Sequence, residues 1–252
     1  MSSTRGFEFV ESCIATVLQS DAMTELSASG DAADNNPYLR LESLDGSDAG
    51  SLRLWQAGDG SRLDRMIHVQ LLAGPVATQL FFIYGKSDSC MPHFHAQVVQ
   101  FPPDGCVYNV DLLPRLDAIT HPNYLSEAFL PLTKPYLKAT NKAENTCSKA
   151  LMNPAIAAYL SPWGIVSQRT DLEEFERVRP QVEAYLEHYL HLSQSLAYSA
   201  DAAELIKRDA AHLDRFFDDD LDPRAWNGVY RIIGEAAGQK IKSILKTPLH
   251  PV

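Results

Sequence analysis

The part of the sequence that most constrains the fold is a series of apolar runs between residues 52 and 113, separated by brief turns. The runs cover residues 52–55, 66–73, 77–84, 93–101 and 106–113, and the breaks between them are rich in Gly, Pro and Asp. Strands with such short connections are antiparallel, because parallel neighbours need crossovers of a dozen or more residues. The sequence therefore predicts an antiparallel meander.

Helical patterns stand before and after this meander. Apolar residues at helical spacing predict a helix over 6–20 and a long helix after a capping box at Asp171, in which Pro180 is a candidate point of interruption. Two more helices are expected at about 200–217 and 227–247. Residues 21–50 are expected to be partly a mobile loop, and residues 163–167 another strand. A sheet covered by later helices implies an α+β fold in one domain, residues 1–252.

Composition and charge exclude several classes of function. The chain has 252 residues, 45% hydrophobic and 21% charged, which is typical of a soluble globular protein. No apolar run approaches the ~20 residues of a membrane span, and the start lacks a signal peptide, so we expect a cytoplasmic protein. A formal charge of −10 disfavours nucleic acid and anionic membranes as partners.

Motifs for common cofactors are missing. The four cysteines form no CxxC pair, and no GxGxxG, GxxxxGK[ST], GxSxG or HExxH motif is present. His93 and His95 resemble one motif of the cupins, but the further Glu and second His motif of those metal sites are absent. We therefore expect no bound metal, and a metal-dependent enzyme using His93 and His95 is the least favoured alternative.

Polar side chains lie on one face of the hairpin at residues 93–113. Alternation along a strand places His93, His95 and Gln97 together, opposite Phe94 and Ala96. This face is either the wall of a pocket or the solvated side of an edge hairpin.

The acidic run at 218–222 is a second polar feature. Such a run usually forms a solvated turn in which Asp222, before Pro223, caps the next helix. One of its aspartates could instead point inward.

Several short segments, taken in order, resemble the ferredoxin-dependent bilin reductase superfamily, and within it red chlorophyll catabolite reductases. They are residues 65–70, the hairpin that begins Pro92-His93-Phe94, residues 121–125, Ser161-Pro162-Trp163, and Arg208-Asp209 leading to residues 219–222. The resemblance covers roughly residues 60–247, and it is carried by the order of these segments.

The resemblance implies a three-layer α/β/α sandwich with a central antiparallel sheet flanked by helices, and a linear tetrapyrrole held between the sheet and the C-terminal helices. It implies an oxidoreductase with no bound cofactor, in which reduced ferredoxin supplies single electrons, the substrate becomes a radical, and protein groups supply protons. The location would be the cytoplasm, or the plastid stroma for a plant or alga whose transit peptide has been removed. The alternative is a non-catalytic tetrapyrrole carrier.

The resemblance also suggests catalytic residues. Asp220 matches a C-terminal proton donor of the family, whereas Gln97 stands where relatives have an acid. Gln70 replaces a Glu of one branch, and Phe82 lies about where that branch has a catalytic His. His95 is then the expected substitute donor, because an imidazole titrates near neutral pH.

Further residues are expected to contact the substrate, and one of them, His93, is also a weaker candidate proton donor than His95. His93 and Asn109 belong to the hairpin, and Arg169 and Lys207 could meet the carboxylates of the tetrapyrrole. Acidic ferredoxin requires a local basic surface on so acidic a protein. The candidates are Lys134, Lys138, Lys142 and Lys149, and, near the C-terminus, Arg231, Lys240, Lys242 and Lys246.

Overall fold

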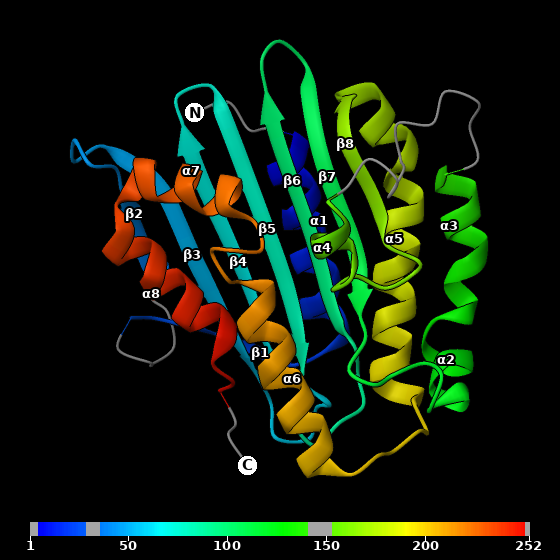
Figure 1. The fold of residues 1–252 in the computed structure, drawn as a ribbon. Helices are drawn as coiled ribbons and strands as arrows, with labels where there is room; N and C mark the ends of the chain where they lie inside the picture. Colours follow the sequence, from blue (N-terminus) through cyan, green and yellow to red (C-terminus); the bar gives the residue numbers. More distant parts are fainter. Residues whose placement is uncertain (1–4, 29–35, 141–152, 250–252) are drawn as a thin grey trace.

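The fold is built around one antiparallel sheet (Figure 1). The computed structural model describes residues 5–28, 36–140 and 153–249, leaving aside the side chains of Gln168 and Arg169. Within these residues the sheet has eight strands in the order β1-β3-β4-β5-β6-β7-β8, and β2 also pairs with β3. The strands are β1 (Met23–Leu26), β2 (Leu39–Glu42), β3 (Asp48–Ala57), β4 (Leu63–Ala73), β5 (Val76–Gly85), β6 (His93–Phe101), β7 (Gly105–Leu113) and β8 (Ile165–Asp171).

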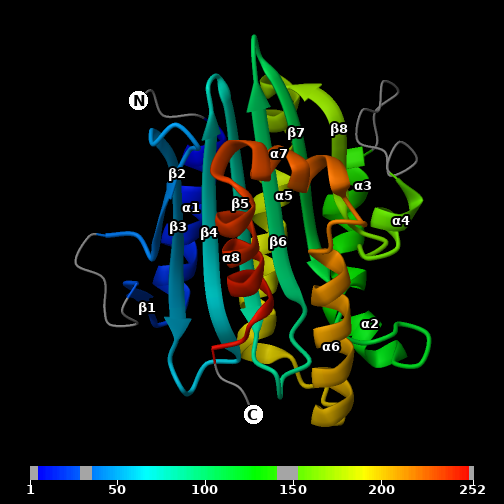
Figure 2. The same ribbon diagram turned by 60° about the vertical axis from the view of Figure 1, so that its left-hand side comes forward.

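Helices cover both faces of the sheet (Figures 1 and 2). One face is covered by α1 (Arg5–Ser20) and α5 (Leu172–Ser195), and α3 (Thr133–Thr140) packs against α5. The other face is covered by α6 (Ala202–Phe216), α7 (Pro223–Ile233) and α8 (Glu235–Lys246). Shorter helices are α2 (Pro122–Ala128), η1 (Leu130–Leu132) and α4 (Pro154–Ala157). The expected α/β/α sandwich is confirmed.

Strand alternation divides the core into two parts. Phe94, Ala96 and Val98 of β6 are fully buried against the α1 and α5 side, in the cluster that also holds Phe9 and Phe175. Neighbouring positions on the sheet, such as Phe82 and Tyr84 of β5, pack in the second cluster with α6, α7 and α8. Because side chains alternate, His95 and Gln97 face this second helical layer.

The structure differs from the sequence-based predictions for two helices. The single helix expected over 227–247 is wrong: α7 begins earlier, at Pro223, and Gly234 separates it from α8. Gly234 has a φ of +81°, which glycine adopts without the penalty of a side chain, so the chain turns there. The candidate interruption at Pro180 does not occur, and α5 continues through it.

Residues 21–50 contain more structure than expected. The strands β1 and β2 and the first residues of β3 lie in this region, which was expected to be partly a mobile loop, and its residues 29–35 lie outside the described residues. Both β1 and β2 have four residues and lie at the sheet edge, and their apolar residues alternate only weakly.

Of the cysteines, Cys13, Cys90 and Cys106 are buried free thiols, and Cys147 is outside the described residues. None of the helices described here has both the length and the apolar composition to cross a bilayer.

Candidate functional site

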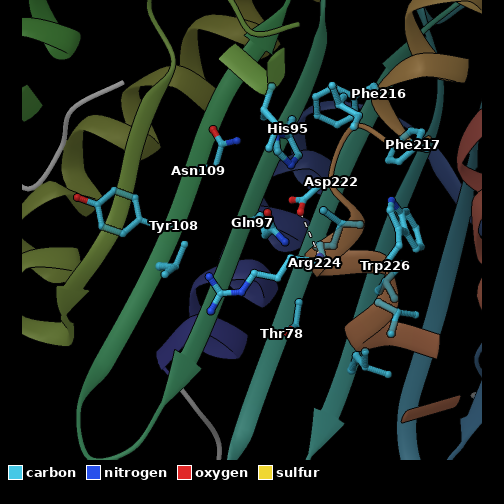
Figure 3. Close-up of a pocket in the computed structure, with 18 of the residues that line it drawn as sticks. Thr78, His95, Gln97, Tyr108, Asn109, Phe216, Phe217, Asp222, Arg224 and Trp226 are labelled. Carbon is cyan, nitrogen blue, oxygen red and sulfur yellow. Dashed lines mark hydrogen bonds between the residues drawn. The ribbon is translucent and has the colours of Figure 1, made fainter. Parts of the chain in front are cut away.

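A cavity of about 350 Å³ lies between the sheet and the helices that cover it (Figure 3). Strands β4 to β8 form its floor, and the end of α6, the acidic turn, α7 and α8 form the opposite wall. Most of its lining is apolar, including Val69, Leu71, Leu80, Val166, Phe217, Val229 and Ile241. An apolar cavity with a few polar groups is typical of a site for a large organic ligand.

Uncharged polar side chains lie on the floor of the cavity. Gln97 on β6 and Asn109 on β7 are directly opposite each other in the strand pairing, and His95 and Thr78 lie beside them. Asn109 Oδ1 and His95 Nδ1 are buried and have no hydrogen-bond partner among the described residues. Leaving a buried polar atom unpaired costs about 1–3 kcal/mol, so a ligand that bonds these atoms gains from them.

Aromatic rings surround His95. Its imidazole stacks on Phe82 with ring centroids 4.5 Å apart, and Phe216 of α6 meets it edge-on at 5.5 Å. Burial lowers the pKa of His95 to about 3, because the surrounding rings cannot solvate an imidazolium. His95 is therefore neutral at pH 7.

His93 belongs to a buried polar cluster next to the cavity and does not line it. Its Nδ1 accepts a hydrogen bond from the Gly85 N–H, so Nε2 carries the proton and donates to Asp209 at 2.7 Å. Arg115 lies 3.3 Å from both oxygens of the same carboxylate. Burial raises the pKa of Asp209, but His93 and Arg115 lower it more, with a net result well below its usual range. This cluster ties α6 to the sheet, and both nitrogens of His93 are occupied.

The helical wall supplies the charged groups of the cavity. Asp222 and Arg224 reach from the start of α7 toward Gln97 (Figure 3). Asp222 caps α7 by accepting the Ala225 N–H at 3.1 Å, which agrees with its predicted role as a cap. Among the described side chains that line the cavity, Asp222 is the one carboxylate and Arg224 the one guanidinium.

The other aspartates of the acidic turn point elsewhere. Asp220 is exposed and does not line the cavity, and its backbone N–H donates to Asp218 at 2.7 Å. Asp219 accepts from Tyr230 at 2.7 Å and from Lys242, whose ammonium also lies 4.2 Å from the ring centre of Trp226. Lys242 thereby holds Trp226, a further wall residue, in place. The aspartate of this run that faces the cavity is Asp222.

Two further predicted site residues, Gln70 and Lys207, lie away from the floor. Gln70 lies between Val69 and Leu71, which line the cavity, so alternation places it on the opposite face of the sheet. Lys207 is exposed on α6 and does not line the cavity. The side chain of Arg169 is outside the described part of the chain.

The sequence reasoning missed the cavity roles of Asp222, Arg224, Trp226 and Phe216. A usable signal was present, because Asp222-Pro223 fixes a helix start, and a helix start after a long helix is a common place for ligand contacts. No group of three or more His, Cys, Asp or Glu side chains suited to a metal ion occurs among the described residues.

Comparison with known proteins gives a partial match in sequence and a match in fold that covers most of the chain. No protein-family model matches the chain. Over 88 residues, the chain is 30% identical to red chlorophyll catabolite reductase 1, chloroplastic, of Oryza sativa subsp. japonica; this segment is 33% of the chain and only 27% of that relative.

The fold comparison covers much more of the chain. A crystal structure of selenomethionine phytochromobilin synthase from tomato, in complex with biliverdin, superposes with a TM-score of 0.67 at 15% identity. The match covers 93% of the chain and 80% of the tomato protein, and it shows a shared fold. The resemblance to red chlorophyll catabolite reductase is thus confirmed over this segment of the sequence, and the chain shares the fold of phytochromobilin synthase.

Proposed function

We propose that this protein is an oxidoreductase that reduces a linear tetrapyrrole with electrons from reduced ferredoxin. The observation that carries the proposal is the apolar cavity between the sheet and α6 to α8, floored by His95, Gln97 and Asn109. A tetrapyrrole is a long apolar pigment with pyrrole N–H, carbonyl and carboxylate groups, and this cavity offers partners for each. The fold is also that of a protein solved with biliverdin.

The polar groups of the cavity suggest how such a pigment lies. Asn109 Oδ1, which has no partner in the described structure, would accept a pyrrole N–H. Arg224 is placed to meet a substrate carboxylate, a role that the sequence suggested for Arg169 and Lys207. Phe216 and Trp226 provide flat apolar surfaces for the pyrrole rings.

Reduction of one double bond needs two electrons and two protons. Ferredoxin would deliver the electrons one at a time, so the protein's own task is to supply protons at defined atoms. Asp222 is the acid that lines the cavity, and we propose it as a donor in competition with Asp220, the residue that the family resemblance favours. The two carboxyl groups can be distinguished by mutation.

His95 would act only after the substrate has gained charge. Burial keeps its ring neutral before an electron is added, so it holds no spare proton at pH 7. An electron added to the pigment places a negative charge beside the imidazole, and a nearby opposite charge favours imidazolium. His95 would then take up one proton from solvent and pass it to the pigment radical anion, which returns the imidazole to its neutral form.

Ferredoxin, as the electron donor, would need a basic docking surface on this protein. Arg231 and Lys240 are exposed on α7 and α8, the helices that cover the cavity, and Lys134 and Lys138 lie on α3. Lys242 is buried against Asp219 and is not free to meet a partner, and Lys142 and Lys149 are outside the described residues. We propose the face of α7 and α8 as the docking surface, because it is next to the cavity.

An anaerobic absorbance time course tests the proposal. Biliverdin and red chlorophyll catabolite, each with reduced ferredoxin, should lose long-wavelength absorbance only when the protein is present. Oxidised ferredoxin and a reaction without ferredoxin are the controls. Loss of neither pigment, at a protein concentration that binds both, would contradict a reductase.

A non-catalytic tetrapyrrole carrier is the second candidate. The observation that favours it is the amide of Gln97 at the centre of the floor, where a proton-donating acid would be expected of a reductase. A carrier would bind the pigment about one to one and leave its spectrum unbleached in the same assay.

The site of action is also a proposal. The rice relative is named as chloroplastic. We propose the plastid stroma if the source is a plant or alga, and the cytoplasm otherwise.

A further inference from the structure

The floor of the cavity carries no charge. Gln97, Asn109 and Thr78 are uncharged by chemistry, and His95 is neutral because aromatic rings enclose it. Gln97 lies at the centre of this group, opposite Asn109 in the pairing of β6 with β7. A ligand lying on the floor therefore meets hydrogen-bonding groups of both kinds from the sheet, and the sheet itself offers it no carboxylate.

The charged groups of the cavity stand on the other side. Asp222 and Arg224 come from the start of α7, two residues apart, and carry opposite charges. Asp222 is further engaged with the backbone N–H of Ala225. The helical wall thus brings no net charge toward the floor.

We infer that Gln97 keeps the bound tetrapyrrole as its uncharged free base; this inference rests on the proposed function. An open-chain conjugated tetrapyrrole contains an imine-type nitrogen that takes up a proton when an anion lies beside it. The Gln97 amide cannot balance that positive charge in an apolar cavity, where an unpaired ion is costly. It can instead donate to the imine nitrogen and accept from a neighbouring N–H, with Asn109 Oδ1 as a second acceptor.

The absorption spectrum of bound biliverdin reports its protonation, because the protonated pigment absorbs further to the red and more strongly than the free base. Wild-type protein should show the free-base spectrum between pH 6 and 8. In Gln97→Glu the new carboxylate should stabilise the protonated pigment and shift the long-wavelength band to the red. Biliverdin in organic solvent, with and without acid, gives the two reference spectra.

Gln100→Glu is the matched control. Gln100 lies on the same strand, three residues along and therefore on the opposite face, and it accepts the Gly6 N–H through Oε1. Glutamate keeps an acceptor at this position, so the fold is retained while the same charge is added away from the cavity. Its bound pigment should have the wild-type spectrum.

The outcomes separate this inference from the proposed function. Binding with a protonated spectrum in the wild type would overturn the inference and leave the proposed function in place. An unshifted spectrum in Gln97→Glu with bound pigment would show that Gln97 does not set the protonation state. Failure of every tetrapyrrole to bind the folded wild-type protein would overturn both.

Discussion

The imidazole of His95 lies on the ring of Phe82 with centroids 4.5 Å apart and planes inclined by 26°. The two residues are direct partners in the pairing of β5 with β6, so the backbone register itself sets the stack. Phe82 thus orients the imidazole of His95 on the cavity floor and also excludes water from it.

Replacing His95 by Gln should separate binding from proton transfer. Glutamine fills a similar space and keeps hydrogen-bonding groups, so the pigment should still bind. If His95 delivers a proton, a tetrapyrrole radical should accumulate and decay slowly, which electron paramagnetic resonance would detect. Normal turnover of His95→Gln without radical build-up would place the proton source elsewhere.

Gln97→Glu should retain activity and change which double bond is reduced.

The paired variants Asp222→Asn and Asp220→Asn decide between the two candidate acids. Asparagine at 222 can still cap α7 through its side-chain oxygen, so the fold should be retained. We expect Asp222→Asn to lower the turnover rate by ~10²-fold, the usual contribution of a positioned acid, and Asp220→Asn to change it little. The reverse result would support the assignment from family resemblance.

Arg224→Gln should weaken binding of carboxylate-bearing tetrapyrroles. The guanidinium lines the cavity but is exposed, so its ion pair with the ligand is partly screened and the dissociation constant should rise only ~3- to 10-fold. A tetrapyrrole whose carboxylates are esterified should bind both proteins equally. Arg231→Gln, at an exposed position of the same helix, is the control. A comparable loss in Lys207→Gln would restore that residue as the carboxylate partner.

Asp209→Asn should destabilise the fold by about 3 kcal/mol, because it leaves the buried Arg115 without its counter-charge. Urea unfolding of the two proteins measures the difference. Asp214→Asn removes an exposed carboxylate from the same helix and should cost far less. Equal losses in the two variants would mean that the cluster does not hold α6 in place.

Acid should destabilise the protein through its buried histidines. Burial lowers the pKa of His68 to about 4, of His95 to about 3 and of His212 to about 4. In the unfolded chain each takes up a proton near pH 6.5, so the unfolded state binds more protons and stability falls as the pH drops from 7 toward 4. Each should contribute about 2 kcal/mol of loss at pH 5. Urea unfolding at pH 7 and 5 should show a smaller loss in His95→Gln; an unchanged pH dependence would contradict this.

The part of the sheet from β3 to β7 was predictable from the sequence because these strands are long and follow one another through short turns, whereas the four-residue strands β1 and β2 were not predicted. His95, Gln97 and Asn109 could be placed on one floor for the same reason, since alternation fixes the face. Gln70 shows that a residue role taken from a family resemblance can fail. The resemblance suggested that Gln70 contacts the substrate, but strand alternation with Val69 and Leu71 places its side chain on the other face of the sheet.

The wall of the cavity was harder to predict. Asp220 and Asp222 are separated by one residue. Which of them faces inward depends on how the turn after α6 packs, and that packing involves Tyr230 of α7 and Lys242 of α8. The break at Gly234 was likewise missed, because the residues on either side of it have good helical spacing and only the backbone angle marks the turn. The pKa of His95 depends on Phe82 and Phe216, from two different elements.

The floor and the wall of the cavity also differ in how their contacts are distributed along the chain. Strands β4 to β7 pair with their sequence neighbours, whereas the wall reaches the sheet through contacts such as His93 with Asp209, 116 residues apart. Local contacts cost less chain entropy to close and form faster than distant ones. We therefore expect the meander to assemble first during folding and the cavity to come into existence only when the C-terminal helices dock, so that newly made chains expose an apolar sheet face until synthesis of α8 is complete.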